Sequence, residues 1–232
     1  MNILNILYIV LVIFITIIYF SAFKNGKPTC NNYILNNYLY LIISLIFLII
    51  LILNLQKTKF DISNNRIMYV LYFIFTLFIA VLLSKPSKNY LYKHILLILF
   101  ISLLALSTSV FYKNIDIEQF IKISIQSGII LIVLTILAIQ FPHFFKDNYL
   151  PYLMFTLPIL IISYMIDSIF YNNDNNKQIT YFSVVIFSLL MVYDTKKIIF
   201  TKLCNPIDYT NTTASLFMDI INMFQNLYIL DN

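Results

Sequence analysis

The stretch LYLIISLIFLIILILNL (residues 39–55) is apolar at almost every position. A bilayer core about 30 Å thick is crossed by roughly 17 to 25 helical residues, and this stretch reaches that length. Inside lipid the backbone must satisfy its own hydrogen bonds, which a continuous α-helix does. The stretch therefore predicts a transmembrane α-helix.

Similar apolar stretches recur along the whole chain. With the first one they cover residues 3–23, 38–55, 68–84, 95–111, 123–141, 150–170, 181–200 and 212–230. The loops between them are too short for a soluble domain, and the stretches are too long and continuous for barrel strands. We therefore predict an all-α fold, a polytopic bundle of membrane helices.

The composition supports an integral, multi-pass membrane protein whose main partner is the lipid bilayer. Of 232 residues, 61% are hydrophobic and 11% are charged, and the mean hydropathy is +0.87. A water-soluble core of this size could not hide so many apolar side chains. The net charge of +5 is spread over short loops without a basic run, so nucleic acid is not a predicted partner.

The loop charges predict an orientation. The loops after the first, third, fifth and seventh stretches hold nine Lys or Arg residues, and the other loops hold six. Under the positive-inside rule this difference places the first set of loops in the cytosol. Cys30 and Cys204 lie in this set, far apart in sequence, and their spacing fits neither a metal site nor a disulfide framework.

Two aspartates lie inside the last two apolar stretches, in MVYDTKK (191–197) and SLFMDIINMFQN (215–226). A central Asp costs about 2.5 to 3.5 kcal/mol on insertion scales, which favours a functional role for Asp194 and Asp219. At 1.5 Å per residue both lie roughly 9 to 11 Å from the loop that joins their helices, so they are predicted to meet. Asp167 lies near the other end of its stretch, and we expect it to be interfacial.

The last stretch carries a polar stripe that includes Asp219. Spacings of 3, 4, 3 and 4 residues put the members of this stripe on one helix face. We predict that this face turns towards the bundle interior or a wet cavity. The stripe consists of Thr212, Ser215, Asp219, Asn222 and Asn226.

Two carboxylates held close in a site of low dielectric constant tend to share one proton and titrate as a unit. Such a pair predicts a pH-sensitive latch that holds two helices together when protonated. When both acids lose the proton, repulsion separates them or a cation binds, and hard oxygen ligands of this kind suit Ca²⁺. In the alternative reading, Asp194 reaches the cytosolic interface or pairs with Lys197 on the same helical face.

The segments FSLLMVYDTKKI (187–198) and SLFMDIINMFQNLYIL (215–230) together resemble the C-terminal signature of the transmembrane Bax inhibitor motif family. That family includes Bax inhibitor, Lifeguard and Golgi anti-apoptotic proteins. The resemblance implies seven family-like helices from about residue 38 to 230, within a membrane domain of residues 38–232. Residues 1–37 form an N-terminal apolar segment and loop. The stretch at about 3–23 is expected to be an extra span that the family usually lacks, and its removal as a signal peptide at Ser21-Ala22 stays an alternative.

The resemblance also implies a function. It implies a calcium-permeable, pH-sensitive leak across an internal membrane, in the endoplasmic reticulum or Golgi of a eukaryotic cell, that protects against cell death. Asp194 and Asp219 would be the paired aspartates that sense protons and contact Ca²⁺, with no other cofactor. In LLSKPSK (82–88), Lys85 or Lys88 would be the basic partner. Apoptosis-regulating membrane proteins would be further partners.

Other functional classes fit less well. Presenilin-like proteases also pair two intramembrane aspartates, but they need Gly-x-Gly-Asp where this chain reads Leu-Phe-Met-Asp. His94 and His143 lie at span edges without a matching ligand cluster, so zinc chemistry is not predicted. We therefore predict that the protein is not an enzyme. A membrane-embedded adaptor that conducts no ions and a proton-coupled cation exchanger remain alternatives.

Overall fold

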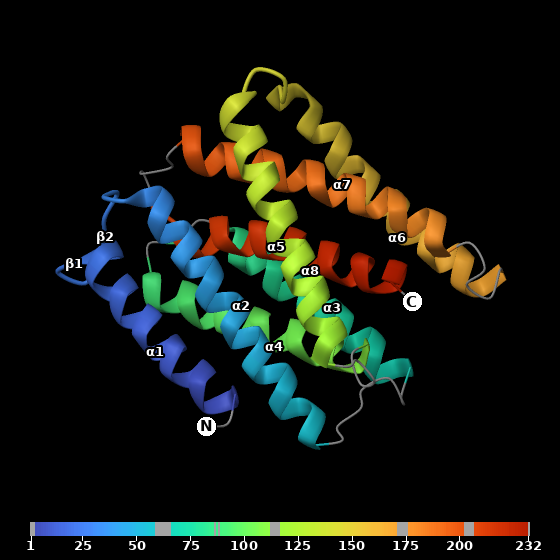
Figure 1. The fold of residues 1–232 in the computed structure, drawn as a ribbon, viewed down its shortest axis with the longest axis horizontal. Coiled ribbons are helices and arrows are strands. Elements are labelled where there is room, and N and C mark those ends of the chain that lie inside the picture. The colour runs from blue at the N-terminus through green and yellow to red at the C-terminus, as the bar shows by residue number, and fades with distance from the viewer. Residues whose placement is uncertain are drawn as a thin grey trace. The chain divides into compact units, whose positions relative to one another are not determined.

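A computed structural model describes residues 3–58, 66–85, 87, 89–111, 117–170, 176–201 and 207–231 of the chain. Each of the predicted apolar stretches forms an α-helix, which confirms the all-α bundle (Figure 1). The helices are α1 (Ile3–Ala22), α2 (Tyr33–Thr58), α3 (Arg66–Ser84), α4 (Tyr90–Phe111), α5 (Ile117–Gln140), α6 (Leu150–Phe170), α7 (Asn176–Lys196) and α8 (Tyr209–Asp231). A 3-10 turn (Asp147–Tyr149) precedes α6, and a π-helix (Lys197–Thr201) extends α7.

Several helices begin before the predicted apolar stretch, because a helix does not end where its hydrophobic residues end. At the start of α4, the Asn89 side chain accepts a hydrogen bond from the backbone N–H of Tyr92 at 3.2 Å. At the start of α8, Asp208 does the same for Asn211 at 3.0 Å. These polar N-caps satisfy backbone donors that the first helical turn leaves unpaired.

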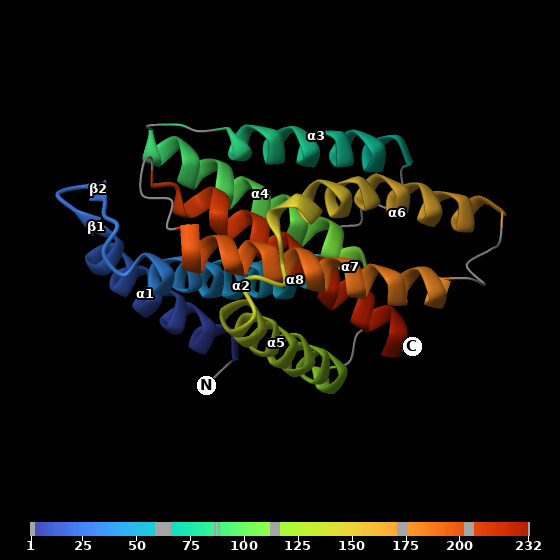
Figure 2. The same cartoon turned by 90° about the horizontal axis from the view of Figure 1, so that it is seen from above.

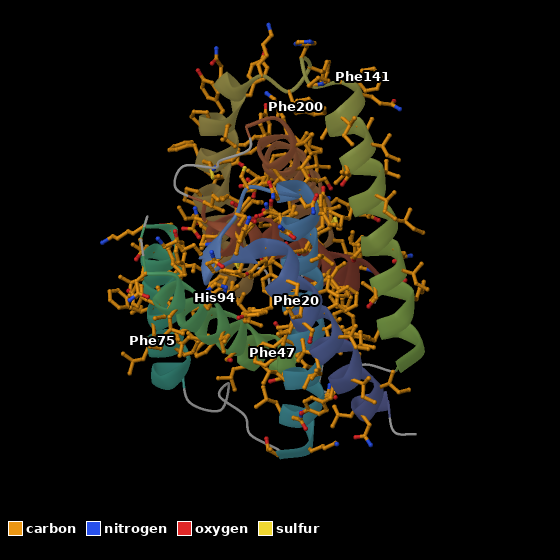
Figure 3. The ribbon with its side chains drawn as sticks, turned by 90° about the vertical axis from the view of Figure 1, so that its left-hand side faces the viewer. Phe20, Phe47, Phe75, His94, Phe141 and Phe200 are labelled. Carbon is orange, nitrogen blue, oxygen red and sulfur yellow. The ribbon has the colours of Figure 1, made fainter. Side chains whose placement is uncertain are left out.

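The helices have the length and surface of membrane spans. Among the described residues, α1, α2, α4 and α5 each contain a stretch long and apolar enough to cross a bilayer, and α3 and α6 contain shorter apolar stretches. Large apolar side chains are exposed on these helices, such as Phe20 in α1 and Phe75 in α3, and Phe141 is exposed directly after α5 (Figure 3). Lipid is the environment in which such surfaces are stable, so the chain is an integral, multi-pass membrane protein.

The chain divides into two compact units. The first contains Met1–Ile115 and Lys202–Ala214. In this unit α2 packs against both α1 and α4, and α3 packs against α4 (Figures 1 and 2). A small hairpin of β1 (Phe23–Lys24) and β2 (Lys27–Pro28) connects α1 to α2. Asn25 and Gly26 have φ values of 53° and 72°, as the tight Asn-Gly turn of a two-residue hairpin requires.

The second unit contains Asp116–Thr201 and Ser215–Asn232. Here α7 packs against α5 and α6. Leu160 of α6 and Ile186 and Leu190 of α7 form the buried centre of the α6–α7 contact. The α8 segment of this unit reaches α5 through the rings of Phe120 and Phe224, whose centroids are 5.4 Å apart.

The expectation that the cysteines form no disulfide is wrong for Cys30, which is disulfide-bonded. The chain's other cysteine, Cys204, lies outside the described residues. The prediction assumed that residues far apart in sequence are also far apart in space. It failed because the loop before α2, which carries Cys30, packs on the start of α8. There the Tyr209 hydroxyl donates a hydrogen bond to the Thr29 carbonyl, across most of the chain. A disulfide is typical of an oxidising compartment, which opposes the cytosolic placement that the loop charges predict for Cys30.

Candidate functional site

The structure brings Asp194 and Asp219 together inside the second unit. Asp194 lies in α7 and is half-buried, whereas Asp219 lies in α8 with 7% of its surface exposed. The two carboxylates are close enough for a direct electrostatic interaction. Two adjacent helices thus present one acid each to a shared, largely buried position.

The two acids differ in their hydrogen bonds. Asp194 accepts one from the Ser215 side chain and also lies in the field of Lys197, which is exposed. The Oδ2 atom of Asp219 is buried and has no hydrogen-bond partner among the described residues. A buried polar oxygen without a partner is costly, so this atom is the position where a proton, a water molecule or a cation would be most stabilising.

The polar stripe of α8 is mostly enclosed. Asp219 and Asn226 are buried and Asn222 is half-buried, while Ser215 is exposed. The opposite, apolar face is buried too, as the fully buried side chains of Phe217 and Met223 show. The polar stripe alone did not predict this enclosure of α8 on both faces.

Immediately beyond Asp194, the helix changes its hydrogen-bonding pattern. α7 ends at Lys196, and the following turn, Lys197–Thr201, is a π-helix. Short π-helical turns are rare and frequently lie at functional sites. The unusual backbone hydrogen bonding therefore lies at the same end of α7 as Asp194.

The predicted basic partners are not brought to this site by any described contact. Lys85 is exposed, follows the end of α3 and belongs to the first unit, whereas both acids belong to the second. Lys88 lies outside the described residues, as does the side chain of Asp167. A partnership of Lys85 or Lys88 with the acids stays a prediction.

The donors available for a metal are few. Within the described part of the chain, three or more His, Cys, Asp or Glu side chains never gather closely enough to hold a metal ion. A Ca²⁺ ion at Asp194 and Asp219 would need neutral oxygens and water to complete its shell of 6 to 8 ligands. The arrangement therefore fits a transient, partly hydrated cation better than a tightly held one.

A buried ion pair in the first unit was missed by the sequence reasoning. Lys93 is 2% exposed, and its Nζ lies 2.7 Å from Oδ2 of Asp208 and also donates to the Leu83 carbonyl. The other carboxylate oxygen of Asp208 caps α8. In the sequence, Lys93 is only one of the loop charges that set the orientation. Asp208, directly before Tyr209 and Thr210, is a recognisable N-cap signal and could have drawn attention to this ion pair.

His94 is likewise more than a surface group (Figure 3). It is half-buried, with Nδ1 2.6 Å from the Tyr90 carbonyl and Nε2 2.7 Å from the Tyr40 hydroxyl. A carbonyl can only accept, so Nδ1 carries a proton, and in the neutral imidazole Nε2 then accepts from the Tyr40 hydroxyl. Beside it, Lys93, Asp208 and Tyr209 line a cavity of about 10 Å³, which is roughly the space for one water molecule.

These features define a class: an integral, multi-pass membrane protein whose last two helices bring a buried and a half-buried acid together. The family follows from a comparison with known sequences. Residues 30–231 match the family described as inhibitor of apoptosis-promoting Bax1, and the chain belongs to this family. The suspected Bax inhibitor resemblance is thereby confirmed, and the protein is a membrane protein of an anti-apoptotic family. Neither the curated proteins nor the solved structures contain a significant match.

Proposed function

We propose that this protein is a pH-sensitive calcium leak channel of an internal membrane, with an anti-apoptotic role, and that Asp194 and Asp219 gate it. One observation carries the proposal. Asp219 has a buried carboxylate oxygen that finds no hydrogen-bond partner in the described part of the chain, and its helix places it close to a second acid. Such an arrangement is costly for a purely structural role, and it suits a site that exchanges protons and cations.

The gating follows from electrostatics. Two carboxylates held close together cannot comfortably both be charged in a site of low dielectric constant, so they share a proton. With the proton present, one acid can donate to the other and hold α7 against α8. When the proton leaves, repulsion between the acids favours separation of the helices or entry of a cation. Acid therefore closes the channel, and a rise in pH opens it.

The cation chemistry follows from the ligands near the pair. Carboxylate, hydroxyl and amide oxygens are hard ligands that suit Ca²⁺. Asp194, Asp219, Ser215 and Asn222 supply such atoms, with Asn226 further along the stripe, and water would complete the shell. Lys85 or Lys88 would compete with the cation by offering one carboxylate a counter-charge.

The cellular setting is part of the proposal. We expect the protein in the endoplasmic reticulum or Golgi membrane of a eukaryotic cell, where a slow leak would lower the stored Ca²⁺. Apoptosis-regulating membrane proteins would then respond to the lowered store or bind the protein directly. If binding alone gave protection, the protein would be an adaptor, and if flux required a counter-ion gradient, it would be a proton-coupled exchanger.

The test is Ca²⁺ flux through purified protein in liposomes over a range of pH values. We expect flux that rises with pH and does not depend on an imposed proton gradient. Asp219→Asn should remove most of the pH response while the protein stays folded. Asp231→Asn makes the same chemical change at the exposed end of the same helix and should leave the response unchanged.

Three outcomes would contradict the proposal. Wild-type liposomes without flux would favour the adaptor. Flux that appears only with a proton gradient would favour the exchanger. Folded Asp219→Asn protein with wild-type flux at every pH would show that the acids do not gate the channel.

A further inference from the structure

A second polar cluster lies in the same unit, farther towards the end of α8 than Asp219, where α6, α7 and α8 meet. The hydroxyl of Tyr164 in α6 lies 2.8 Å from Oδ1 of Asn226 in α8. It also lies 3.1 Å from Oγ of Ser183 and 3.4 Å from Oγ1 of Thr180, both in α7. Thr180 and Ser183 are fully buried, and Asn226 is 7% exposed. One hydroxyl thus occupies the centre of three buried oxygens.

The protons in this cluster are unevenly distributed. Ser183 donates its hydroxyl proton to the Ile179 carbonyl at 2.9 Å, and Asn226 donates through Nδ2 to the Asn222 carbonyl at 2.6 Å. Both side chains therefore present oxygen lone pairs to Tyr164, which has a single proton to donate. The shortest distance assigns that proton to Asn226. The cluster has an excess of acceptors, which favours a positive charge at its centre.

The cluster lies in line with the two acids. Asn226 follows Asp219 by seven residues, which is about two turns or roughly 10.5 Å along α8. Asn222 lies between them on the same face. The polar stripe therefore runs along α8 from Asp219 to Asn226, where the Tyr164 hydroxyl covers its end.

We propose that Thr180, Ser183 and Asn226 form a second station for a partly hydrated metal cation, which the Tyr164 hydroxyl plugs in the closed protein. This inference rests on the proposed channel function. The three oxygens are neutral, so the station binds a cation more weakly than a carboxylate pair. Weak binding suits passage, because conduction requires that an ion can leave each site. Opening requires the Tyr164 hydroxyl to leave Asn226, after which the cation takes the place of the phenolic proton.

The competing explanation is that the cluster only holds helices together. Hydroxyl and amide side chains often bond across membrane helices, and such bonds stabilise helix packing modestly. Loss of a purely structural bond changes stability and leaves flux the same or lower. Loss of a plug raises flux. The two roles thus differ in the sign of the effect.

The test compares Tyr164→Phe with Tyr152→Phe in the liposome flux assay. Tyr152 lies in the same helix with 73% of its surface exposed, so its variant controls for loss of a phenolic hydroxyl from α6. We expect Tyr164→Phe to raise Ca²⁺ flux about 3- to 10-fold, as loss of one hydrogen bond from the closed state allows. A pH response should remain, because the acids are unchanged. Tyr152→Phe should match the wild type.

A second variant tests the station itself and does not depend on the folding of the first. Ser183→Ala removes one ligand oxygen and leaves Tyr164 in place, so it should lower Ca²⁺ flux severalfold. Wild-type flux in folded Tyr164→Phe or in Ser183→Ala overturns the second station while leaving the acid gate intact. Absence of flux in the wild type overturns the proposed function together with this inference.

Discussion

The Lys93 ammonium lies 2.7 Å from the Asp208 carboxylate, and only 2% of the Lys93 side chain is exposed. Asp208 also caps α8, the helix that carries Asp219 eleven residues later. A single ion pair therefore fixes the point where this helix starts.

Lys93→Met should destabilise the protein by about 3 kcal/mol, because it leaves Asp208 without its cation in a largely buried place. Asp208→Asn should cost less, since an amide oxygen still accepts from Lys93 and still caps a helix. The measurement is thermal stability in detergent. Lys24→Met, at an exposed lysine of the same unit, is the control and should change little. Equal effects of Lys93→Met and Lys24→Met would show that the ion pair does not stabilise the fold.

Asp194 and Asp219 should act as one unit in the flux assay. If they share a proton, neutralising either removes most of the pH response, and neutralising both adds little more. Asp219→Asn should have the larger single effect, because Asp194 is half-exposed and already bonded to Ser215. A double-mutant cycle of flux against pH measures the coupling. Additive effects of the two single variants would mean that the acids titrate independently.

Asp231, one residue beyond the predicted span, predicts a pH effect on stability. A hydrogen bond from Lys122 lowers the pKa of Asp231 below its ordinary value. A lowered pKa in the folded protein means that the pair stabilises the fold above the ordinary Asp value of about 3.9 and loses this effect as the pH falls through the folded value. Asp231→Asn should thus lower the melting temperature slightly at pH 7 and have no effect near pH 2. A difference that grows towards acid would contradict the assignment.

The disulfide at Cys30 predicts a redox-dependent pattern of thiol labelling. In denatured, unreduced protein, a maleimide reagent should label neither cysteine, and after reduction it should label both. Cys30→Ser should expose one reactive thiol without reduction and should lower the melting temperature, since a disulfide typically contributes about 2 to 4 kcal/mol. Two labels on the unreduced wild type would show that the cysteines are free and would remove the objection to a cytosolic loop.

The helices could be predicted from the sequence because hydrophobic length alone reports a membrane span. The apolar stretch at 150–170 and α6 coincide, and the last stretch differs from α8 only at its ends. The helix starts were less predictable. α5 begins at Ile117, ahead of the predicted residue 123, because Lys122 and Gln119 can remain helical outside the hydrocarbon while they bond to Asp231.

The acids could be identified because a carboxylate in an apolar stretch is conspicuous. Their hydrogen bonds could not, since a contact such as Ser215 to Asp194 depends on how two helices pack. Lys93 and Tyr164 were missed for a related reason. A lysine at a helix start and a tyrosine among many tyrosines carry no signal until the packing shows that the first is buried against Asp208 and the second against Asn226.

Pro158 lies inside α6, six residues before Tyr164. A proline has no backbone N–H, so the carbonyl of Met154 lacks the helical bond that this position would otherwise provide, and the ring crowds the preceding turn. Helices commonly bend at a proline, because the backbone hydrogen bond that it cannot donate no longer holds that turn straight. The part of α6 that carries Tyr164 can therefore bend about this turn relative to the first half, and Leu160, at the centre of the α6–α7 contact, moves with it. A small swing there would be magnified at the phenolic oxygen, at the far end of the longest side chain in its cluster.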